Sequence, residues 1–420
     1  MNQGSSVHIR LFCKVLLNFI NKGMKGHCKF WVLQSFNGLF AIGSSLSFFL
    51  AVTCAYLFIF PRFRPGIHNY DLISNSSSSI SKCNVFKGRW IPDETYPLYN
   101  ASECPFLERG FNCLANGRRD RSYTKWKWKP KNCDIPRLNV PEILEMLRGK
   151  RIVFVGDSLS RTQWESMICI LMTGVEDKSQ VYEVNGNRIT RQIRFLSVRF
   201  SSFNFSIDFY RSVFLVQPGS VPKSAPKRVK STLKLDKLDS ISTEWIDSDI
   251  LIFNSGHWWT PTKLFDMNCY FQIGSSLKLG MPITSAFRVA LRTWASWVDA
   301  SINMNRTSVF FRTFETSHWS GPNRNSCKVT RRPSLRPRGR EHSVISDTIL
   351  DVVKNMKAGV KVLHVTPMGA FRSDAHVGTW SDKPKVPDCS HWCLPGVPDM
   401  WNEILFSHLL SNYRLHLPSA

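Results

Sequence analysis

The longest apolar stretch of the chain lies near its N-terminus. Residues 39–60 (LFAIGSSLSFFLAVTCAYLFIF) contain no charged side chain, and a helix needs about 20 such residues to cross a bilayer. The stretch therefore predicts a transmembrane signal anchor. The alternatives are a buried core helix or a cleaved signal peptide, although the apolar run of a signal peptide is usually shorter, about 7–15 residues. Met24 is an alternative start to Met1, because the whole anchor follows it.

Charges beside this stretch predict its orientation. Residues 1–38 hold Lys and Arg but no acid, which predicts a cytoplasmic tail, although Arg62 and Arg64 weaken the asymmetry. We therefore expect a single-pass type II protein with residues 61–420 in a lumen. Sequons for N-glycosylation occur only after the anchor, which agrees with this orientation. They begin at Asn75, Asn100, Asn204 and Asn305.

Two segments separate the anchor from the most regular part of the chain. Residues 61–82 have no periodic pattern and include a run of serines, which predicts a flexible stem. Residues 83–150 are rich in Trp, Pro and Cys and are interpreted as an N-terminal subdomain. Within it, the alternation of Trp and Lys in residues 126–129 indicates either a surface that stacks on sugars or bases, or a strand with Trp on one face.

From residue 151 onwards, short apolar runs alternate with segments of helical spacing. This alternation predicts an α/β domain over residues 151–412, with a parallel sheet covered by helices on both faces. Residues 181–216 alternate in polarity and predict several short strands. Basic, Pro-bearing segments at 218–237 and 324–340 are interpreted as loops. The predicted strands are 151–155, 249–253, 308–314 and 360–365, and the predicted helices are 159–172, 287–302, 344–356 and 398–410.

The net charge of +24 and pI of about 9.8 first suggest a nucleic-acid partner. Other features oppose it, because 43% of the residues are hydrophobic and the predicted anchor and sequons place the basic part in a lumen. After residue 60, 50 basic residues face 31 acidic ones. This excess indicates either a groove for an acidic polysaccharide or a solvated surface without a specific role.

The first candidate for chemistry is Ser158, in the sequence Gly-Asp-Ser after the strand at 151–155. Ligands of open α/β sheets bind outside the carboxyl ends of the strands, and a helix N-terminus favours an adjacent oxyanion. Ser158 is thus a candidate nucleophile, with an ordinary helix-capping serine as the alternative.

A serine nucleophile needs a base, and the base needs an orienting carboxylate. Asp388 and His391 lie together in the sequence DCSHWC before the last predicted helix, so they are candidates for these roles. A metal site that uses Cys389, His391 and Cys393 is the alternative. That spacing is unusual for zinc, and a lumen favours disulfides, so we expect no metal.

A third block, Asn254-Ser-Gly256-His257-Trp258, follows the strand at 249–253 and should open on the same edge of the sheet. The amide of Asn254 and the backbone N–H of Gly256 are candidate oxyanion donors. His257 competes with His391 for the role of base, but it lacks a carboxylate close in sequence. Candidate substrate contacts are Arg161, His257, Trp258 and His318, the last with loop packing as the alternative.

These blocks, in this order, resemble the plant trichome birefringence-like family, which carries a PC-esterase domain related to the GDSL/SGNH hydrolases. GRW, YPLY, CDIPR, LDKLD and ETSHWSG extend the resemblance from about residue 83 to 410. It implies a three-layer SGNH-like fold and a triad of Ser158, Asp388 and His391, with Asn254 in the oxyanion hole. It also implies a Golgi type II O-acetyltransferase that acts on cell-wall polysaccharide.

The resemblance further implies a disulfide pairing, which the residues alone do not determine. Cys269 is then left unpaired. No bound cofactor is expected; acetyl-CoA or an acetylated intermediate would donate the acetyl group. A polysaccharide acetylesterase and a non-catalytic pectin-bridging protein are the rival functions. The implied pairs are Cys83–Cys133, Cys104–Cys169, Cys113–Cys393 and Cys327–Cys389.

Overall fold

A computed structural model of the chain describes residues 83–190, 192–321, 326–337 and 343–415. The predicted tail, anchor and stem, together with Asn75, lie outside these ranges. Within the ranges, none of the helices combines the length and the apolar character that crossing a bilayer requires.

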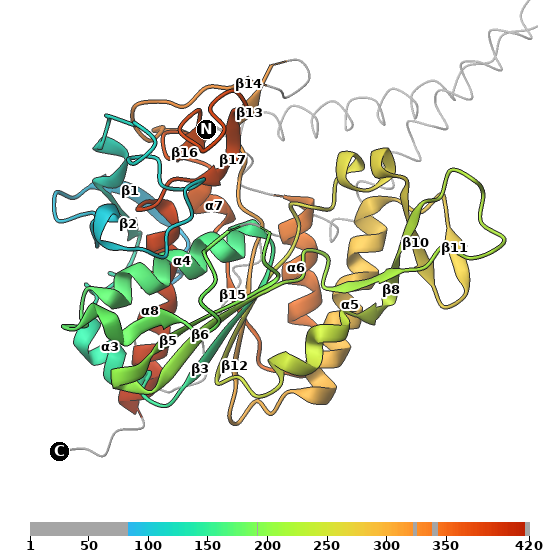
Figure 1. The fold of residues 1–420 in the computed structure, drawn as a ribbon, viewed down its shortest axis with the longest axis horizontal. Helices are drawn as coiled ribbons and strands as arrows, with labels where there is room; N and C mark the ends of the chain where they lie inside the picture. Colours follow the sequence, from blue (N-terminus) through green and yellow to red (C-terminus); the bar gives the residue numbers. More distant parts are fainter. Residues whose placement is uncertain (1–82, 191, 322–325, 338–342, 416–420) are drawn as a thin grey trace, which may run out of the picture. The chain divides into compact units, whose positions relative to one another are not determined.

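A seven-stranded sheet forms the centre of the fold (Figure 1). Its strands run parallel from β15 to β6, as the alternating pattern predicted. β5 and β4 are antiparallel, so the sheet is mixed and the prediction of a parallel sheet was wrong at this edge. The reason is the tight connection from β5 to β6 through Asn204, whose φ is 55°, because so short a turn joins only antiparallel neighbours. In spatial order the strands are β15 (Lys361–Leu363), β12 (Ser308–Arg312), β9 (Ile250–Asn254), β3 (Arg151–Gly156), β6 (Phe205–Arg211), β5 (Phe195–Phe200) and β4 (Val181–Glu183).

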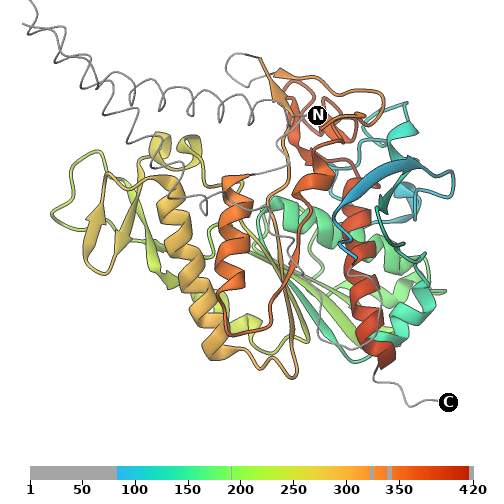
Figure 2. The same cartoon turned by 180° about the vertical axis from the view of Figure 1, so that it is seen from behind.

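Helices cover both faces of this sheet (Figures 1 and 2). The side chains of β3 explain why: Ile152 and Phe154 belong to one apolar core, which includes residues of α3, α4 and α8. Val153 and Val155 belong to a second core with residues of α5 and α6. A strand buried on both faces reads as a continuous apolar run, which made β3 recognisable in the sequence. The helices are α3 (Val140–Met146), α4 (Ser158–Met172), α5 (Ile283–Ser301), α6 (Val344–Lys354), α7 (Thr366–Gly369) and α8 (Val397–Leu415).

A smaller four-stranded sheet, in the order β11-β10-β8-β7, lies beside α5. It corrects the prediction that residues 218–237 form one loop. β8 alternates buried Leu233 and Leu235 with the more exposed Lys234 and Asp236, so its apolar side chains pack into the second core. The charges and prolines of this segment concealed that alternation. The strands are β7 (Val216–Gly219), β8 (Ser231–Leu238), β10 (Cys269–Ile273) and β11 (Ser276–Lys278).

The Cys- and Trp-rich N-terminal segment packs on α4 and α8 and shares their apolar core. Its strands β1 (Gly88–Pro92) and β2 (Trp126–Pro130) are antiparallel. Trp128 on β2 is only 2% exposed and meets Trp90 edge to face. The strand interpretation of residues 126–129 is therefore right, and Trp128 is a core side chain.

All four predicted disulfides are present: Cys83–Cys133, Cys104–Cys169, Cys113–Cys393 and Cys327–Cys389. Cys269 is the free, buried cysteine among the described residues, also as predicted. Two of the disulfides join the N-terminal segment to α4 and to the residue that follows β17 (Asp388–Trp392). The cross-links therefore fix the N-terminal segment against the α/β core.

Candidate active site

Ser158 is the first residue of α4, immediately after the turn that follows β3. Asp157 is the N-cap, and its carboxylate accepts a hydrogen bond from Leu159 N at 2.9 Å. The turn requires glycine at 156, because a Cβ there would lie 1.9 Å from Asn254 Oδ1. The Gly-Asp-Ser sequence therefore places a hydroxyl at a helix N-terminus, on the carboxyl edge of the sheet.

His391 and Asp388 reach this serine from β17. Ser158 Oγ lies 2.6 Å from His391 Nε2, and Asp388 Oδ2 lies 2.6 Å from His391 Nδ1. Asp388 Oδ1 also accepts the backbone N–H groups of Ser390 and His391, both at 2.9 Å. A carboxylate so held accepts the Nδ1–H, and Nε2 is then free to accept the proton of the Ser158 hydroxyl. The structure brings the three predicted residues into one hydrogen-bonded chain.

The electrostatics of this pair fit a general base. Burial raises the pKa of Asp388, but the charge and hydrogen bond of His391 and the two backbone N–H groups hold it well below its usual value. Burial lowers the pKa of His391, but the charge and hydrogen bond of Asp388 raise it above its usual value overall. Asp388 is thus an anion that strengthens His391 as a base.

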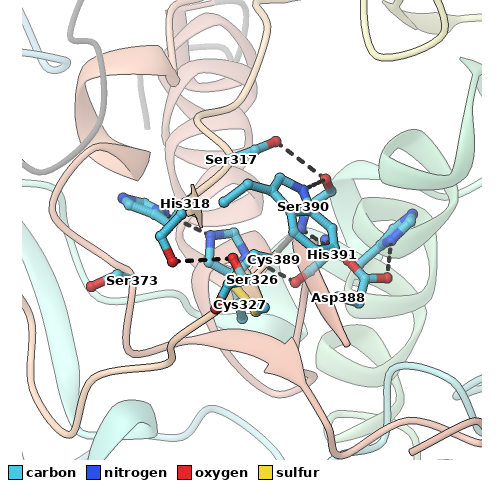
Figure 3. Close-up of a disulfide and its surroundings, with 12 residues drawn as sticks. Ser317, His318, Ser326, Cys327, Ser373, Asp388, Cys389, Ser390 and His391 are labelled. Atoms are coloured by element: carbon cyan, nitrogen blue, oxygen red, sulfur yellow. Dashed lines mark hydrogen bonds and ion pairs between the residues drawn. A yellow bond between two sulfur atoms is a disulfide. The ribbon is translucent and has the colours of Figure 1, made fainter. Parts of the chain in front are cut away.

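Disulfides anchor β17 on both sides of His391, and Figure 3 shows the one between Cys327 and Cys389. Cys389 is bonded to Cys327 on β14 (Ser326–Cys327), and Cys393 is bonded to Cys113. Because both cysteines are in disulfides, they are not available as thiolate ligands, which removes the alternative of a Cys/His metal site here. Among the described residues, no cluster of three or more His, Cys, Asp or Glu side chains is arranged to hold a metal ion.

Of the two candidate oxyanion residues, Asn254 contacts Asp157, the residue before Ser158. The amide of Asn254 accepts the backbone N–H of Asp157 at 3.2 Å and donates to Asp157 Oδ1 at 3.0 Å. A Cβ at Gly256 would lie 2.8 Å from Ile345 Cγ2, so close packing explains this glycine. Neither residue is among those that line the cavity described below. Their part in an oxyanion hole stays a prediction.

A cavity of about 580 Å³ opens over Ser158, Asp388 and His391. This volume is within the range of about 300–1,000 Å³ that is usual for ligand sites. Its walls carry both basic and aromatic side chains from β6, the β9–β10 connection and the loops around β17. The basic residues are Arg161, Arg211, Lys263 and Lys383, and the aromatic ones include Phe111, Phe209, Trp258 and Trp319.

Three of the four candidate substrate contacts line this cavity: Arg161, His257 and Trp258. Arg161 is 2% exposed and forms ion pairs with Glu108 and Glu165, so it also ties α4 to the N-terminal segment. His318 is not among the lining residues. His318, labelled in Figure 3, has its Nδ1 2.7 Å from His376 Nε2. The other ring nitrogen of His376, Nδ1, lies 3.0 Å from His391 O. His318 thus packs behind β17, as the alternative interpretation held.

His257 has a carboxylate partner that sequence reasoning missed. Its Nε2 lies 2.8 Å from Oε2 of Glu315, whose side chain is 1% exposed and forms an ion pair with Arg312. Burial lowers the pKa of His257 to about 4 and that of Arg312 to about 9. Glu315 stands in the ETSHWSG block shortly after β12. Residues that directly follow parallel strands lie at the carboxyl edge of the sheet, and this rule, which placed Asn254 there, also applies to Glu315.

Comparison with known proteins gives two matching families and several similar plant proteins. Residues 135–408 match PC-Esterase, described as the GDSL/SGNH-like acyl-esterase family found in Pmr5 and Cas1p, and residues 81–134 match the PMR5 N terminal domain. The chain is 59% identical to "Protein trichome berefringence-like 7" of Arabidopsis thaliana over 377 residues, 89% of this chain and 84% of the relative. It is 38% identical to trichome birefringence-like 9 of the same plant over 411 residues, 92% of this chain and 99% of the relative.

Proposed function

Because the chain belongs to the trichome birefringence-like family and carries its GDSL/SGNH-like acyl-esterase domain, we propose that it is an O-acetyltransferase of cell-wall polysaccharide. The observation that carries the proposal is the hydrogen-bonded chain from Ser158 through His391 to Asp388, at the base of an open cavity. Xylan and pectin are the proposed acceptor classes.

The first half of the reaction loads the serine. His391 takes the hydroxyl proton of Ser158 as Oγ attacks the acetyl carbonyl of the donor, and His391 then protonates the leaving group. The Ser158 acetyl ester is the product. Asp388 stays ionised and stabilises the imidazolium formed at His391. Acetyl-CoA or an acetylated intermediate is the proposed donor, as a co-substrate and not a bound cofactor.

The second half transfers the acetyl group. A sugar hydroxyl gives its proton to His391 and attacks the ester carbon, the bond from that carbon to Oγ breaks, and His391 returns the proton to Ser158. Water in place of the sugar gives hydrolysis, so the same residues serve an esterase. A transferase must therefore hold the sugar where water would otherwise attack.

The acceptor is proposed to be acidic, such as pectin or xylan that bears uronic acids. Trp258 in the cavity wall has two cations near its ring: Lys263 Nζ lies 4.9 Å from the centroid and the Arg211 guanidinium carbon 5.5 Å. Cations beside an aromatic ring suit a sugar that carries a carboxylate, since the ring contacts its apolar face and the cations its charge. Nucleic acid is not a proposed partner.

The proposed location is the Golgi membrane, in single-pass type II orientation with the active site in the lumen. The predicted anchor and the disulfides of an oxidising compartment support it. The sequons at Asn100, Asn204 and Asn305 are exposed, as glycan attachment requires.

Acetyl transfer by the full-length protein in detergent tests the proposal. The protein is incubated with acetyl-CoA or an acetylated donor and a panel of defined xylan and pectin oligosaccharides, and the products are read by mass spectrometry. We expect the wild type to add acetyl groups and Ser158→Ala to add none. Transfer that survives Ser158→Ala would refute the acetyl-serine mechanism. Release of acetate from acetylated oligosaccharide without transfer would favour the esterase. Pectin binding without either activity would favour the bridging protein.

A further inference from the structure

His257 and Glu315 form a second histidine–carboxylate pair at the carboxyl edge of the sheet. His257 follows β9 and Glu315 follows β12, and these strands are parallel neighbours with Asn254 opposite Arg312. The register therefore delivers both side chains to one point on the edge. His257 Nε2 lies 2.8 Å from Glu315 Oε2, and Phe314 stacks on the imidazole with ring centroids 4.2 Å apart. The ring is thus held by a hydrogen bond and by a flat contact.

The environment of this pair differs from that of His391. The His257 side chain is 13% exposed and lines the cavity over Ser158, whereas Glu315 is 1% exposed beneath it. Burial lowers the pKa of His257 to about 4, which keeps the imidazole neutral at the pH of a lumen. The pKa of His391 is shifted in the opposite direction by Asp388. Two histidines in one cavity whose pKa values are pushed apart have different tasks.

Glu315 determines which ring nitrogen of His257 carries the proton. A carboxylate accepts, so Nε2 bears the hydrogen, and Nδ1 of the neutral ring keeps a lone pair. Nδ1 has no hydrogen-bond partner among the described residues, and it is not sealed from solvent. Because Nε2 is turned to the buried carboxylate, the accessible edge of the ring is the one that carries Nδ1.

We propose that His257 binds the acceptor: its Nδ1 accepts a hydrogen bond from a hydroxyl of the sugar next to the one that is acetylated. Glu315 fixes the tautomer and forms an ion pair with Arg312 on its other side. His257 moves no proton; His391 remains the base of both half-reactions. The sugar is thereby held against the acetyl-serine, so His257 favours transfer over hydrolysis. This inference rests on the proposed acyl transfer, of which it names the acceptor contact.

The two half-reactions separate this role from a structural one. Acetyl-serine formation is measured with full-length protein and 4-nitrophenyl acetate as the burst of nitrophenol. Partitioning is measured as acetylated oligosaccharide divided by free acetate, with a xylan or pectin oligosaccharide that the wild type accepts. His257→Phe keeps a flat ring for Phe314 but has no ring nitrogen, and His257→Asn restores a short side chain with a hydrogen-bond acceptor.

We expect His257→Phe to form the acetyl-serine within about threefold of the wild-type rate, which also shows that the variant is folded. The ratio of transfer to hydrolysis should fall roughly tenfold, as for the loss of one hydrogen bond of about 1.4 kcal/mol, with a higher KM for the acceptor. His257→Asn should recover part of the ratio. His408→Phe is the matched control, because burial also lowers the pKa of His408 to about 4 and it also packs on a phenylalanine, Phe310, but outside the cavity lining.

An unchanged ratio in His257→Phe would overturn the proposal. An equal loss of the burst and of transfer would also overturn it, because His257 would then support the fold or the triad. If the wild type forms no acetyl-serine or transfers nothing, the proposed function itself fails, and that result precedes any comparison of variants.

Discussion

The disulfide between Cys327 and Cys389 offers a test that separates stability from catalysis. Cys389 lies between Asp388 and His391 on β17, so the cross-link holds the strand that carries both side chains (Figure 3). The double variant Cys327→Ser/Cys389→Ser removes it without other changes. A matched control exists in Cys83→Ser/Cys133→Ser, because that disulfide closes a similar length of chain far from β17 in sequence.

The expected loss of stability follows from the loops that the two disulfides close. Cys327 and Cys389 are 62 residues apart, and the chain-entropy model gives about 4.3 kcal/mol for a loop of that length. Cys83 and Cys133 are 50 residues apart, which gives about 4.1 kcal/mol. With an unfolding entropy of about 2.1 cal/mol/K per residue, a folded part of roughly 330 residues should lose about 6 °C in Tm in either case.

Activity should respond differently in the two variants. The control keeps Cys389 bonded to Cys327, so its burst with 4-nitrophenyl acetate should stay near wild type at 20 °C. In Cys327→Ser/Cys389→Ser the burst rate should fall at least tenfold at the same temperature. A displacement of about 1 Å in a catalytic group lowers the reaction rate by up to 10²-fold. Thermal unfolding and the burst rate are measured on the same samples. Equal activity in the two variants, with equal losses in Tm, would refute the view that this disulfide orients the triad.

Other variants test the triad and its turn. Asp388→Asn removes the charge that raises the pKa of His391, so the acid limb of the kcat/KM profile should move to lower pH. The wild-type limb should lie above pH 6.5, since His391 must be neutral to act and its raised pKa keeps it protonated to higher pH; kcat should fall on the order of 10⁴-fold as the tautomer is lost. A limb that does not move would contradict the assignment of Asp388. Gly156→Ala should lower the free energy of unfolding by about 1–3 kcal/mol, because its Cβ would overlap Asn254 Oδ1. Gly280→Ala, with no atom within 4 Å of its Cβ, should stay near wild type in the same urea titration, and equal losses would contradict the overlap.

Much of the fold was predictable because many of its strands and helices have local sequence patterns that indicate them. β3 and β9 are apolar runs that are buried on both faces, and α5 and α6 follow helical spacing. Where a second signal competed, prediction failed. Charges and prolines concealed β8, and the alternating polarity of residues 181–216 did not reveal that β5 runs antiparallel to both β6 and β4. Whether a strand pairs parallel or antiparallel depends on which strand lies beside it, and a short pattern of polarity does not identify that neighbour.

The sequence by itself determined the Ser158 turn, the Asp388–His391 pair and, through a family resemblance, the pairing of the cysteines; it predicted a loop for Asp388–Trp392, which the structure shows to be the strand β17. These features are local or are carried by ordered motifs, so residue type and spacing were enough. Only the tertiary structure decided that Ser158 Oγ meets His391 Nε2 across 233 residues and that His257 meets Glu315 across 58. The His257–Glu315 contact arises from strand order, since the parallel neighbours β9 and β12 bring their carboxyl ends to one edge whatever their separation in the chain. His391 reaches Ser158 from β17, which belongs to a separate two-stranded sheet. Glu315 can be read from the sequence, but its pairing with His257 depends on which strands are neighbours in the sheet.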